Sequence, residues 1–323
     1  MKKWFVGGLV LGAMLVVGRS ELACAEEVEV IDNAEIEVTE APEEMVDFVE
    51  AAIPEDTNEA IVEYDSANEQ EIESPLRSAL RSRSLSENML AEAYMPEDSS
   101  LEIAPRTILG RDDRYRVTNT TAFPNRAVGL IEVTFPNGRT TYGSAAMVGK
   151  NVALTAGHCL YNKSFGGWAK KVTYYPARNG SSLPYGSYRG RKFISSQTYI
   201  NTGNIAYDWG VIRFDSNPGG KHGYFGFQTT EADQTGKRLY TRGYPGDKAF
   251  GTMYGCAGNL LGYNSNKLRM FYTMDTTGGQ SGSPIYDSNN IIQAVHTHSG
   301  STRNVGRRID KTLYNVLNNG RKW

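Results

Sequence analysis

The stretch Gly278–Pro284, with the sequence GGQSGSP, places Ser281 among three glycines in a chain of 323 residues. Glycine tolerates positive φ, so this backbone can turn tightly enough to aim the N–H groups of Gly279 and Ser281 at one point. Two converging N–H groups can stabilise an oxyanion. A serine hydroxyl is a weak nucleophile near neutral pH, so hydrolysis by Ser281 also requires a base and an acid that orients the base.

Two further motifs can supply that base and that acid. The motif TAGHC follows an apolar run and carries His158, and the motif YDWG opens another apolar run and carries Asp208. Each residue alone has an ordinary structural explanation, such as a core histidine, a capping aspartate or a loop serine. Taken together, they predict a catalytic triad of His158, Asp208 and Ser281, with the N–H groups of Gly279 and Ser281 as oxyanion donors.

The remainder of residues 107–323 alternates short apolar and β-branched runs with turn residues. Ala127–Phe135 and Thr140–Val148, for example, flank an Asn-Gly turn, which is the pattern of a β-hairpin. A helical period occurs only near the end, before Gly320. The pattern predicts an all-β fold with two small barrels, at about 107–220 and about 221–305, and a C-terminal helix at about 309–319.

The N-terminus has the composition of an export signal. Lys2 and Lys3 precede an apolar run that ends near Ala23-Cys24-Ala25, so residues 1–25 are predicted to be a signal peptide that is cleaved after Ala25. The apolar run of about 15 residues is shorter than the roughly 20 that a membrane-spanning helix needs. We therefore expect a secreted, extracellular protein without stable membrane association.

Residues 26–106 and 107–323 carry opposite charges. The first segment has 24 acidic and four basic residues, and the second has 11 acidic and 27 basic residues. So acidic a segment with few aromatic residues is not expected to build a core. We interpret residues 26–106 as an acidic propeptide that covers a basic mature domain, 107–323. A basic surface alone would also suit a polyanion-binding domain, but we expect no nucleic-acid partner.

Glutamate is unevenly distributed along the chain. Residues 26–106 contain 19 glutamates, whereas residues 107–323 contain only Glu132 and Glu231. A protease that cuts after glutamate would benefit from this deficit, although a basic surface also lacks acids. The cysteines leave two readings open, because Cys159 and Cys256 of an exported chain could form a disulfide or remain buried thiols. Carboxylates are too sparse in 107–323 to nominate a calcium cage, so the sequence leaves calcium binding open and indicates no metal ligands and no cofactor.

Several motifs resemble a known family. TAGHC, DWGVI and GGQSGSP, in this order, are similar to the chymotrypsin superfamily, and ILGRDDRYRVTNTTAFPNRA, GYPGDK, MDTTGGQSGSP and AVHTHSG resemble the bacterial glutamyl endopeptidases, which include the staphylococcal V8 protease. The match runs from about Thr107 to the C-terminus. It implies two six-stranded antiparallel β-barrels and a monomeric secreted serine endopeptidase. Such an enzyme cleaves after Glu, and more weakly after Asp, through an acyl-enzyme on Ser281.

The resemblance also implies the residues that read the substrate. His296 stands where the family has a histidine that binds the glutamate side chain, and Thr276 matches the family's pocket threonine. Ser299 is a further possible donor. Strand alternation gives His298 the same face as His296, so one of the two is expected to point into solvent, and His296 is preferred for the pocket.

Activation follows from the same resemblance. The family's mature N-terminus corresponds to Thr107, whose freed amino group is expected to lie near the substrate carboxylate. Arg106 offers a trypsin-type site for an activating protease. Gln280 occupies the place of the aspartate that pairs with the new amino terminus in chymotrypsin-like zymogens, so that ion pair cannot form here.

Two alternative functions remain at this level. Asp275 lies six residues before Ser281, where trypsin-like enzymes carry the aspartate that selects Arg and Lys. If the Asp275 carboxylate entered the pocket, it would attract a cationic substrate and repel glutamate. A catalytically silent, basic binding domain on the same fold is the second alternative, but an intact triad and a removable propeptide are features that it would not need.

Overall fold

The computed structural model describes residues 59–72, 108–300 and 302–322. The chain divides into the units Met1–Glu40 and Ala41–Trp323, and all described residues belong to the second. The predicted signal peptide, Cys24, Arg106 and Thr107 therefore lie outside the described residues. None of the helices in the described ranges is long and apolar enough to span a membrane.

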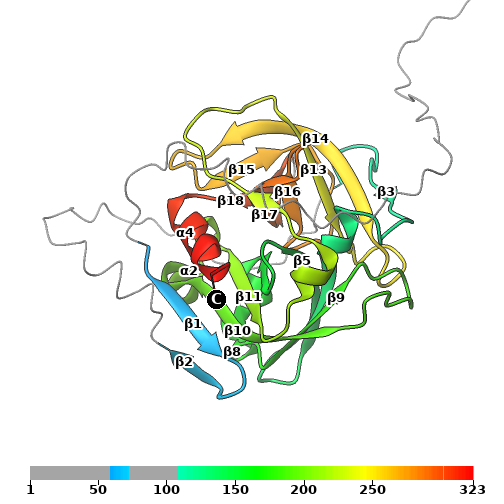
Figure 1. Cartoon of the computed structure of the whole chain (residues 1–323). Coiled ribbons are helices and arrows are strands. Elements are labelled where there is room, and N and C mark those ends of the chain that lie inside the picture. Colours follow the sequence, from blue (N-terminus) through cyan, green and yellow to red (C-terminus); the bar gives the residue numbers. More distant parts are fainter. Residues whose placement is uncertain (1–58, 73–107, 301, 323) are drawn as a thin grey trace, which may run out of the picture. The chain divides into compact units, whose positions relative to one another are not determined.

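The first barrel is a closed ring of six antiparallel strands (Figure 1). The ring follows the order β11-β6-β5-β4-β9-β10, and pairing between β10 and β11 closes it. Its strands are β4 (Val128–Thr134), β5 (Thr140–Met147), β6 (Val152–Thr155), β9 (Lys171–Pro176), β10 (Tyr188–Ser196) and β11 (Gly210–Phe214).

The second barrel is built in the same way. Its ring has the order β17-β16-β13-β14-β15-β18, and β17 pairs with β18 to close it. Two short strands join this ring, β3 (Tyr115–Arg116) beside β14 and β12 (Gly226–Phe227) parallel to β17. The fold prediction of two six-stranded antiparallel barrels is confirmed. The ring strands are β13 (Arg238–Gly243), β14 (Tyr254–Tyr263), β15 (Arg269–Tyr272), β16 (Pro284–Tyr286), β17 (Ile291–Ser299) and β18 (Asn304–Arg308).

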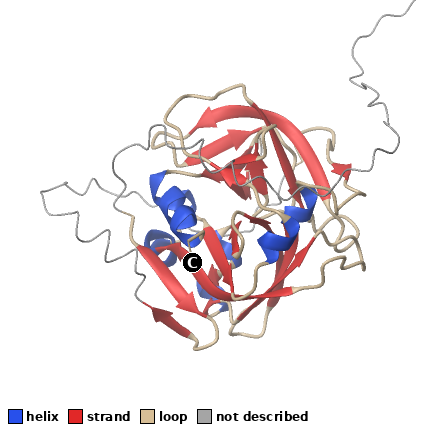
Figure 2. Ribbon diagram, viewed as in Figure 1, coloured by secondary structure: helices blue, strands red, loops and turns tan. Residues whose placement is uncertain are grey.

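Helices are few and short in the described ranges (Figure 2). The C-terminal helix expected at about 309–319 is α4, Lys311–Gly320, and the Asp310 side chain caps it by accepting the Leu313 N–H at 3.0 Å. The buried face of α4 includes Leu313, Val316 and Leu317. The remaining elements are α2 (Gln197–Thr202), α3 (Pro218–His222), the 3₁₀ helices η2 (Asn125–Ala127), η3 (Gly157–Cys159), η4 (Lys163–Phe165) and η5 (Ile205–Tyr207), and the strand pair β7 (Tyr161–Asn162) and β8 (Gly167–Trp168).

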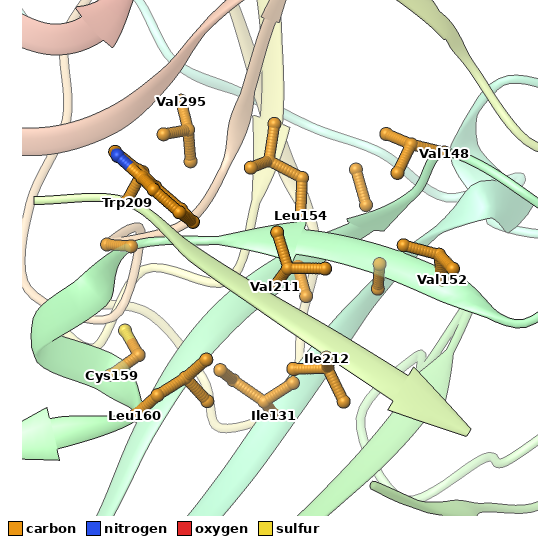
Figure 3. Packing of buried hydrophobic residues seen from close by; sticks show 14 of the residues in the cluster. Ile131, Val148, Val152, Leu154, Cys159, Leu160, Trp209, Val211, Ile212 and Val295 are labelled. Carbon is orange, nitrogen blue, oxygen red and sulfur yellow. The ribbon is translucent and has the colours of Figure 1, made fainter. Parts of the chain in front are cut away.

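One apolar cluster extends from the first barrel into the second. Trp209, which directly follows Asp208, is fully buried and lies beside Val295 of β17 (Figure 3). Leu154 and Val211, from the paired strands β6 and β11, continue the cluster. Burying such large side chains fixes the ends of these strands, which is where the predicted base and acid lie. Cys159 and Cys256 are both buried and do not form a disulfide.

The acidic segment contributes a hairpin to the first barrel. β1 (Ile61–Asp65) pairs antiparallel with β10, and β2 (Gln70–Ile72) pairs with β1. The composition of this segment predicts no contribution to a core, and for residues 61–65 that prediction is wrong. Composition failed here because the segment does not build its own core: Ile61 and Val62 enter the core of the barrel, at 1% and 4% exposure.

Candidate active site

The predicted base and acid form a pair in which the acid is fully buried. His158 lies in η3, directly after β6, and Asp208 follows η5, directly before β11. Because β6 and β11 are antiparallel neighbours, these two strand ends are adjacent. The fully buried Asp208 carboxylate accepts the backbone N–H of His158 at Oδ1 (2.7 Å), and its Oδ2 lies 2.7 Å from Nδ1 of the ring. A side chain at Gly157 would approach Asp208 Oδ1 to 2.9 Å, so glycine keeps this contact possible.

Electrostatics in this pair favour a charged imidazole. Burial alone would lower the pKa of His158, but the Asp208 carboxylate outweighs it and raises the pKa above the ordinary 6.5. Burial would likewise raise the pKa of Asp208, yet His158 lowers it below 3.8. An anionic Asp208 therefore holds the ring with its proton on Nδ1, which leaves Nε2 to accept a proton.

Ser281 lies in the loop between β15 and β16. Gly279 and Gly282 have φ of +91° and +86°, and side chains there would collide with the carbonyl oxygens of Tyr244 and Ser144. The loop is tied to the first barrel by the Ser144 N–H, which donates to the Ser281 carbonyl at 2.8 Å. Within the described ranges the N–H groups of Gly279 and Ser281 donate to no protein oxygen. Both predicted oxyanion donors are thus available to a ligand.

The nucleophile and the base lie on adjoining loops. The carbonyl oxygen of Ser281 is 3.9 Å from Sγ of Cys159, the residue that follows His158. Ser281 Oγ and His158 Nε2 are both buried, and neither makes a hydrogen bond within residues 59–72, 108–300 or 302–322. Hydrogen bonds between nucleophile and base are often long without substrate and tighten in the substrate complex.

The residues predicted to read the substrate lie beside the Ser281 loop. His296 is fully buried in β17, and its Nδ1 is 2.6 Å from the Tyr272 hydroxyl. Its backbone is bonded to the two residues that follow the nucleophile, because Gly282 N–H donates to the His296 carbonyl and His296 N–H donates to the Ser283 carbonyl, each at 2.8 Å. The structure also brings Thr276 and Ser299 together, with hydroxyl oxygens 3.2 Å apart.

His298 occupies a position that strand alternation did not predict. The register of β17 against β18 shifts between His296 and His298, so the two side chains do not share one face as regular pleating would require. Nδ1 of His298 lies 3.5 Å from Asp208 Oδ2, and its ring centroid is 5.6 Å from that of His158. His298 therefore borders the base and acid. A bulge of this kind leaves no clear signal in the sequence.

The Asp275 carboxylate is engaged by the segment that opens the predicted mature domain. Asp275 is 1% exposed. Its Oδ1 accepts the Leu109 N–H at 2.7 Å, and its Oδ2 accepts the Asp113 N–H at 2.9 Å. A carboxylate that binds two backbone donors in this way anchors residues 109–113, and the trypsin-like alternative loses its main support.

The same segment also contributes Arg114, a residue that the sequence did not single out. The fully buried Arg114 guanidinium donates to Asp247, to the Thr277 hydroxyl (2.7 Å) and to Gln280 Oε1 (3.4 Å). Gln280 Oε1 also accepts the Thr277 N–H at 2.9 Å. Burial would lower the pKa of Arg114, but Asp112 and Asp247 raise it. The Arg114 guanidinium thus binds Gln280, the residue that stands where chymotrypsin-like zymogens have an aspartate for the new amino terminus.

The two barrels, the His158–Asp208 pair and the glycine-bounded Ser281 define a serine peptidase of the chymotrypsin fold. The family model described as "Trypsin-like peptidase domain" matches residues 143–294. The chain is 38% identical over 242 residues to "Glutamyl endopeptidase" of Bacillus licheniformis, covering 71% of this chain and 73% of the relative. The chain therefore belongs to the glutamyl endopeptidase family of chymotrypsin-fold serine proteases, and it is a serine endopeptidase.

Other similar proteins include a second glutamyl endopeptidase and a protein that is named as a metalloprotease. "Glutamyl endopeptidase" of Staphylococcus epidermidis is 29% identical over 198 residues, covering 59% of this chain and 66% of the relative. "Extracellular metalloprotease" of Bacillus subtilis (strain 168) is 38% identical over 221 residues, covering 67% of this chain and 70% of the relative. The solved structure "Structure of Glu endopeptidase in complex with MPD" has a TM-score of 0.60 and 30% identity, covering 67% of this chain and all of that one.

The metalloprotease name makes the metal-binding capacity of the chain relevant. In the described ranges, one group of three side chains could hold an ion, namely His158, Asp208 and His298, with ligand atoms within 4.8 Å of one another. This group contains the predicted base and acid. Both Asp208 oxygens already face nitrogen atoms of His158, so the donor set is arranged to orient an imidazole.

Proposed function

We propose that this chain is a secreted, monomeric endopeptidase that hydrolyses peptide bonds after Glu, and more weakly after Asp, with His158, Asp208 and Ser281 as its catalytic residues. The observation that carries the proposal is the buried Asp208 carboxylate, 2.7 Å from Nδ1 of His158, beside a serine loop in which Gly279 and Gly282 have positive φ. This is the orientation that a triad requires of its base.

The reaction proceeds in two steps. His158 Nε2 accepts the proton of Ser281 Oγ as that oxygen attacks the scissile carbonyl, and the N–H groups of Gly279 and Ser281 bind the oxyanion. His158 then gives the proton to the leaving amine, which leaves an acyl-enzyme on Ser281. In the second step His158 takes a proton from water, whose oxygen attacks the ester carbonyl. His158 returns this proton to Ser281 Oγ as the ester bond breaks, which releases the acid product and restores the free enzyme.

Preference for glutamate is supported by donors near the nucleophile. The Tyr272 hydroxyl holds Nδ1 of the buried His296, and Nε2 of that ring is the atom that would donate to the substrate carboxylate. The neighbouring hydroxyls of Thr276 and Ser299 would supply further donors. Asp275 would repel glutamate if it faced the substrate, but its oxygens accept backbone N–H groups.

Processing is part of the proposal. Residues 1–25 would be removed on export, residues 26–106 form the propeptide, and a trypsin-type protease would cut after Arg106 to release 107–323. Leu109 N–H lies 2.7 Å from Asp275, the neighbour of Thr276. Two residues span about 7 Å at most. After the cut, the new amino group of Thr107 would lie within reach of the side chains that would bind the substrate carboxylate.

Two measurements test the proposal on the activated enzyme. A fluorophosphonate should label Ser281, and Ser281→Ala should abolish labelling. Ser283→Ala is the matched control, because Ser283 is fully buried in the same loop and should not affect labelling. Peptides that differ only in Glu or Arg before the scissile bond should then be cleaved at Glu. Faster cleavage at Arg would refute the specificity, and absence of labelling would favour the silent binding domain.

A further inference from the structure

The hairpin of the acidic segment fills an edge of the first barrel that the domain itself leaves unpaired. β9 pairs with β10 only at Tyr188 and Arg189. On that edge, the next partner of β10 is β1, in register from Asp65 opposite Lys192 to Ile61 opposite Ser196 (Figure 1). The Gln197 N–H also donates to the Ala60 carbonyl at 2.8 Å. An open edge strand presents unpaired backbone groups and favours the addition of another strand.

Three side chains of β1, those of Ile61, Val62 and Tyr64, belong to the barrel core. All five residues of Ile61–Asp65 are buried. Tyr64 stacks on Trp168 with ring centroids 5.4 Å apart and planes at 5°, and it contacts Phe193 at 6.2 Å. Removing β1 would expose this apolar surface to water, which is unfavourable.

The glutamates of the hairpin satisfy buried donors of the domain. Trp209 Nε1 donates to Glu59 Oε1 at 3.0 Å, and Trp168 Nε1 donates to Glu71 Oε1 at 2.9 Å. Glu59 also lies 3.4 Å from the guanidinium of Arg307, which is fully buried. A buried donor that loses its acceptor is destabilising. Residues 59–72 therefore supply hydrogen-bond acceptors to donors of the domain 107–323.

Further ion pairs attach the strand at its other end. Glu63 is 2.8 Å from Lys192, with side-chain exposures of 3% and 26%, and Asp65 contacts Arg191. With β1 in place, the His158 side chain keeps 23% of its surface exposed. The attached hairpin therefore leaves part of the His158 side chain uncovered.

We propose that residues 59–72 stay bound after activation as a non-covalent strand of the mature enzyme. The proposal rests on the cleavage after Arg106 suggested above. The bound peptide would bury the glutamyl bonds after Glu59 and Glu63, which are 6% and 2% exposed, while Glu69 and Glu71 are exposed in the hairpin. A strand held in a sheet resists proteolysis because a protease must bind its substrate in an extended, unpaired form.

The test uses the full chain with Ser281→Ala, which prevents self-cleavage, and trypsin as the activating protease. Residues 59–72 contain no Lys or Arg, and the first trypsin site after them is Arg77. After cleavage, size-exclusion chromatography with mass spectrometry should find the fragment that ends at Arg77 together with 107–323. The Gln197 amide should remain protected from hydrogen exchange. Separate elution of the fragment with rapid Gln197 exchange would overturn the proposal.

Two variants sharpen this experiment. Tyr64→Asp removes the aromatic stack and should reduce retention of the fragment more than about tenfold, as expected for loss of a buried aromatic side chain. Gln70→Ser, at an exposed position of β2, is the matched control and should leave retention unchanged. If Tyr64→Asp fails to fold, exchange at Gln197 in the cleaved parent still decides the question.

A second arm separates this proposal from the proposed function. In the activated enzyme with Ser281 intact, the retained peptide should have uncut bonds after Glu59 and Glu63 and a cut bond after the exposed Glu69, which lies in the turn between β1 and β2. Cleavage after Glu59 and Glu63 would overturn retention while supporting glutamate specificity. If no bond after glutamate is cut, the specificity fails, and the Ser281→Ala arm still reports on retention.

Discussion

Asp275→Asn is the substitution that best separates the two possible specificities. The carboxylate accepts two backbone N–H groups, from Leu109 and Asp113, and is 1% exposed. An asparagine keeps one acceptor oxygen and places an amide NH₂ against the second N–H. One hydrogen bond to a charged group is then lost, which costs about 1.5–3 kcal/mol.

That free energy has a defined effect on catalysis. If residues 107–113 must be docked for the substrate carboxylate to be bound, kcat/KM for a Glu peptide should fall about tenfold to about 100-fold, because each 1.36 kcal/mol corresponds to about a factor of ten. Cleavage of the matched Arg peptide should stay negligible in both enzymes. The assay is the hydrolysis of both peptides by activated enzyme, well below its thermal unfolding temperature.

Asp113→Asn is the control for this experiment, because Asp113 is exposed and contacts Asp275 through its backbone N–H only. It should retain the parent kcat/KM. The reasoning would be refuted if Asp275→Asn kept its Glu activity within about twofold of the parent. It would also be refuted if the parent cleaved the Arg peptide and the substitution abolished that activity, since Asp275 would then contact the substrate.

Three further outcomes are expected. Asp208 raises the pKa of His158, so kcat/KM should rise with pH as the ring loses its proton. Asp208→Asn should lower kcat about 10⁴-fold and move this acid limb of the pH profile to lower pH. A protonated His298, 5.6 Å from His158, disfavours a second positive charge, so His298→Asn should move that limb to higher pH, and an unchanged midpoint would contradict this. EDTA should leave peptide hydrolysis unchanged, whereas inactivation reversed by added Zn²⁺ would assign the His158, Asp208 and His298 group to metal binding.

The strands could be predicted because their signals are local, whereas the two six-stranded barrels followed from the family resemblance. Short apolar runs with turn residues between them indicate strands wherever a half-buried hairpin forms, and the terminal helix has its own period. The positions of His158, Asp208 and Ser281 followed from motifs, since glycine at positive φ and an imidazole after a strand are readable in the residues themselves. Their roles remain a proposal.

What could not be predicted depends on contacts between distant segments. Asp275 stands where a trypsin-like aspartate would be, and only the N–H groups of Leu109 and Asp113 show how its charge is used. The position of His298 depends on a register shift against β18. Arg114 meets Gln280 across 166 positions of sequence, and neither residue signals its partner.

The β1 strand shows why composition gave the wrong prediction for the acidic segment. Low hydrophobicity and high charge indicate that a segment cannot build a core alone, but a segment that adds to an existing sheet needs only a few apolar residues. Ile61, Val62 and Tyr64 are the residues of β1 that enter the core. The rule failed because the partner surface belongs to another part of the chain.

The contacts of residues 59–72 show that the acidic segment is held on the basic domain by more than opposite net charge. A diffuse acidic cover would be held by long-range attraction, which salt screens over about 10 Å at 0.1 M ionic strength. Residues 59–72 instead place individual carboxylates on Trp209, Lys192 and Trp168, and they bury Tyr64 against two aromatic rings. Apolar burial is not weakened by salt. The attachment of this hairpin should therefore persist at high ionic strength, and dissociation by salt alone would return the segment to the role of an electrostatic cover.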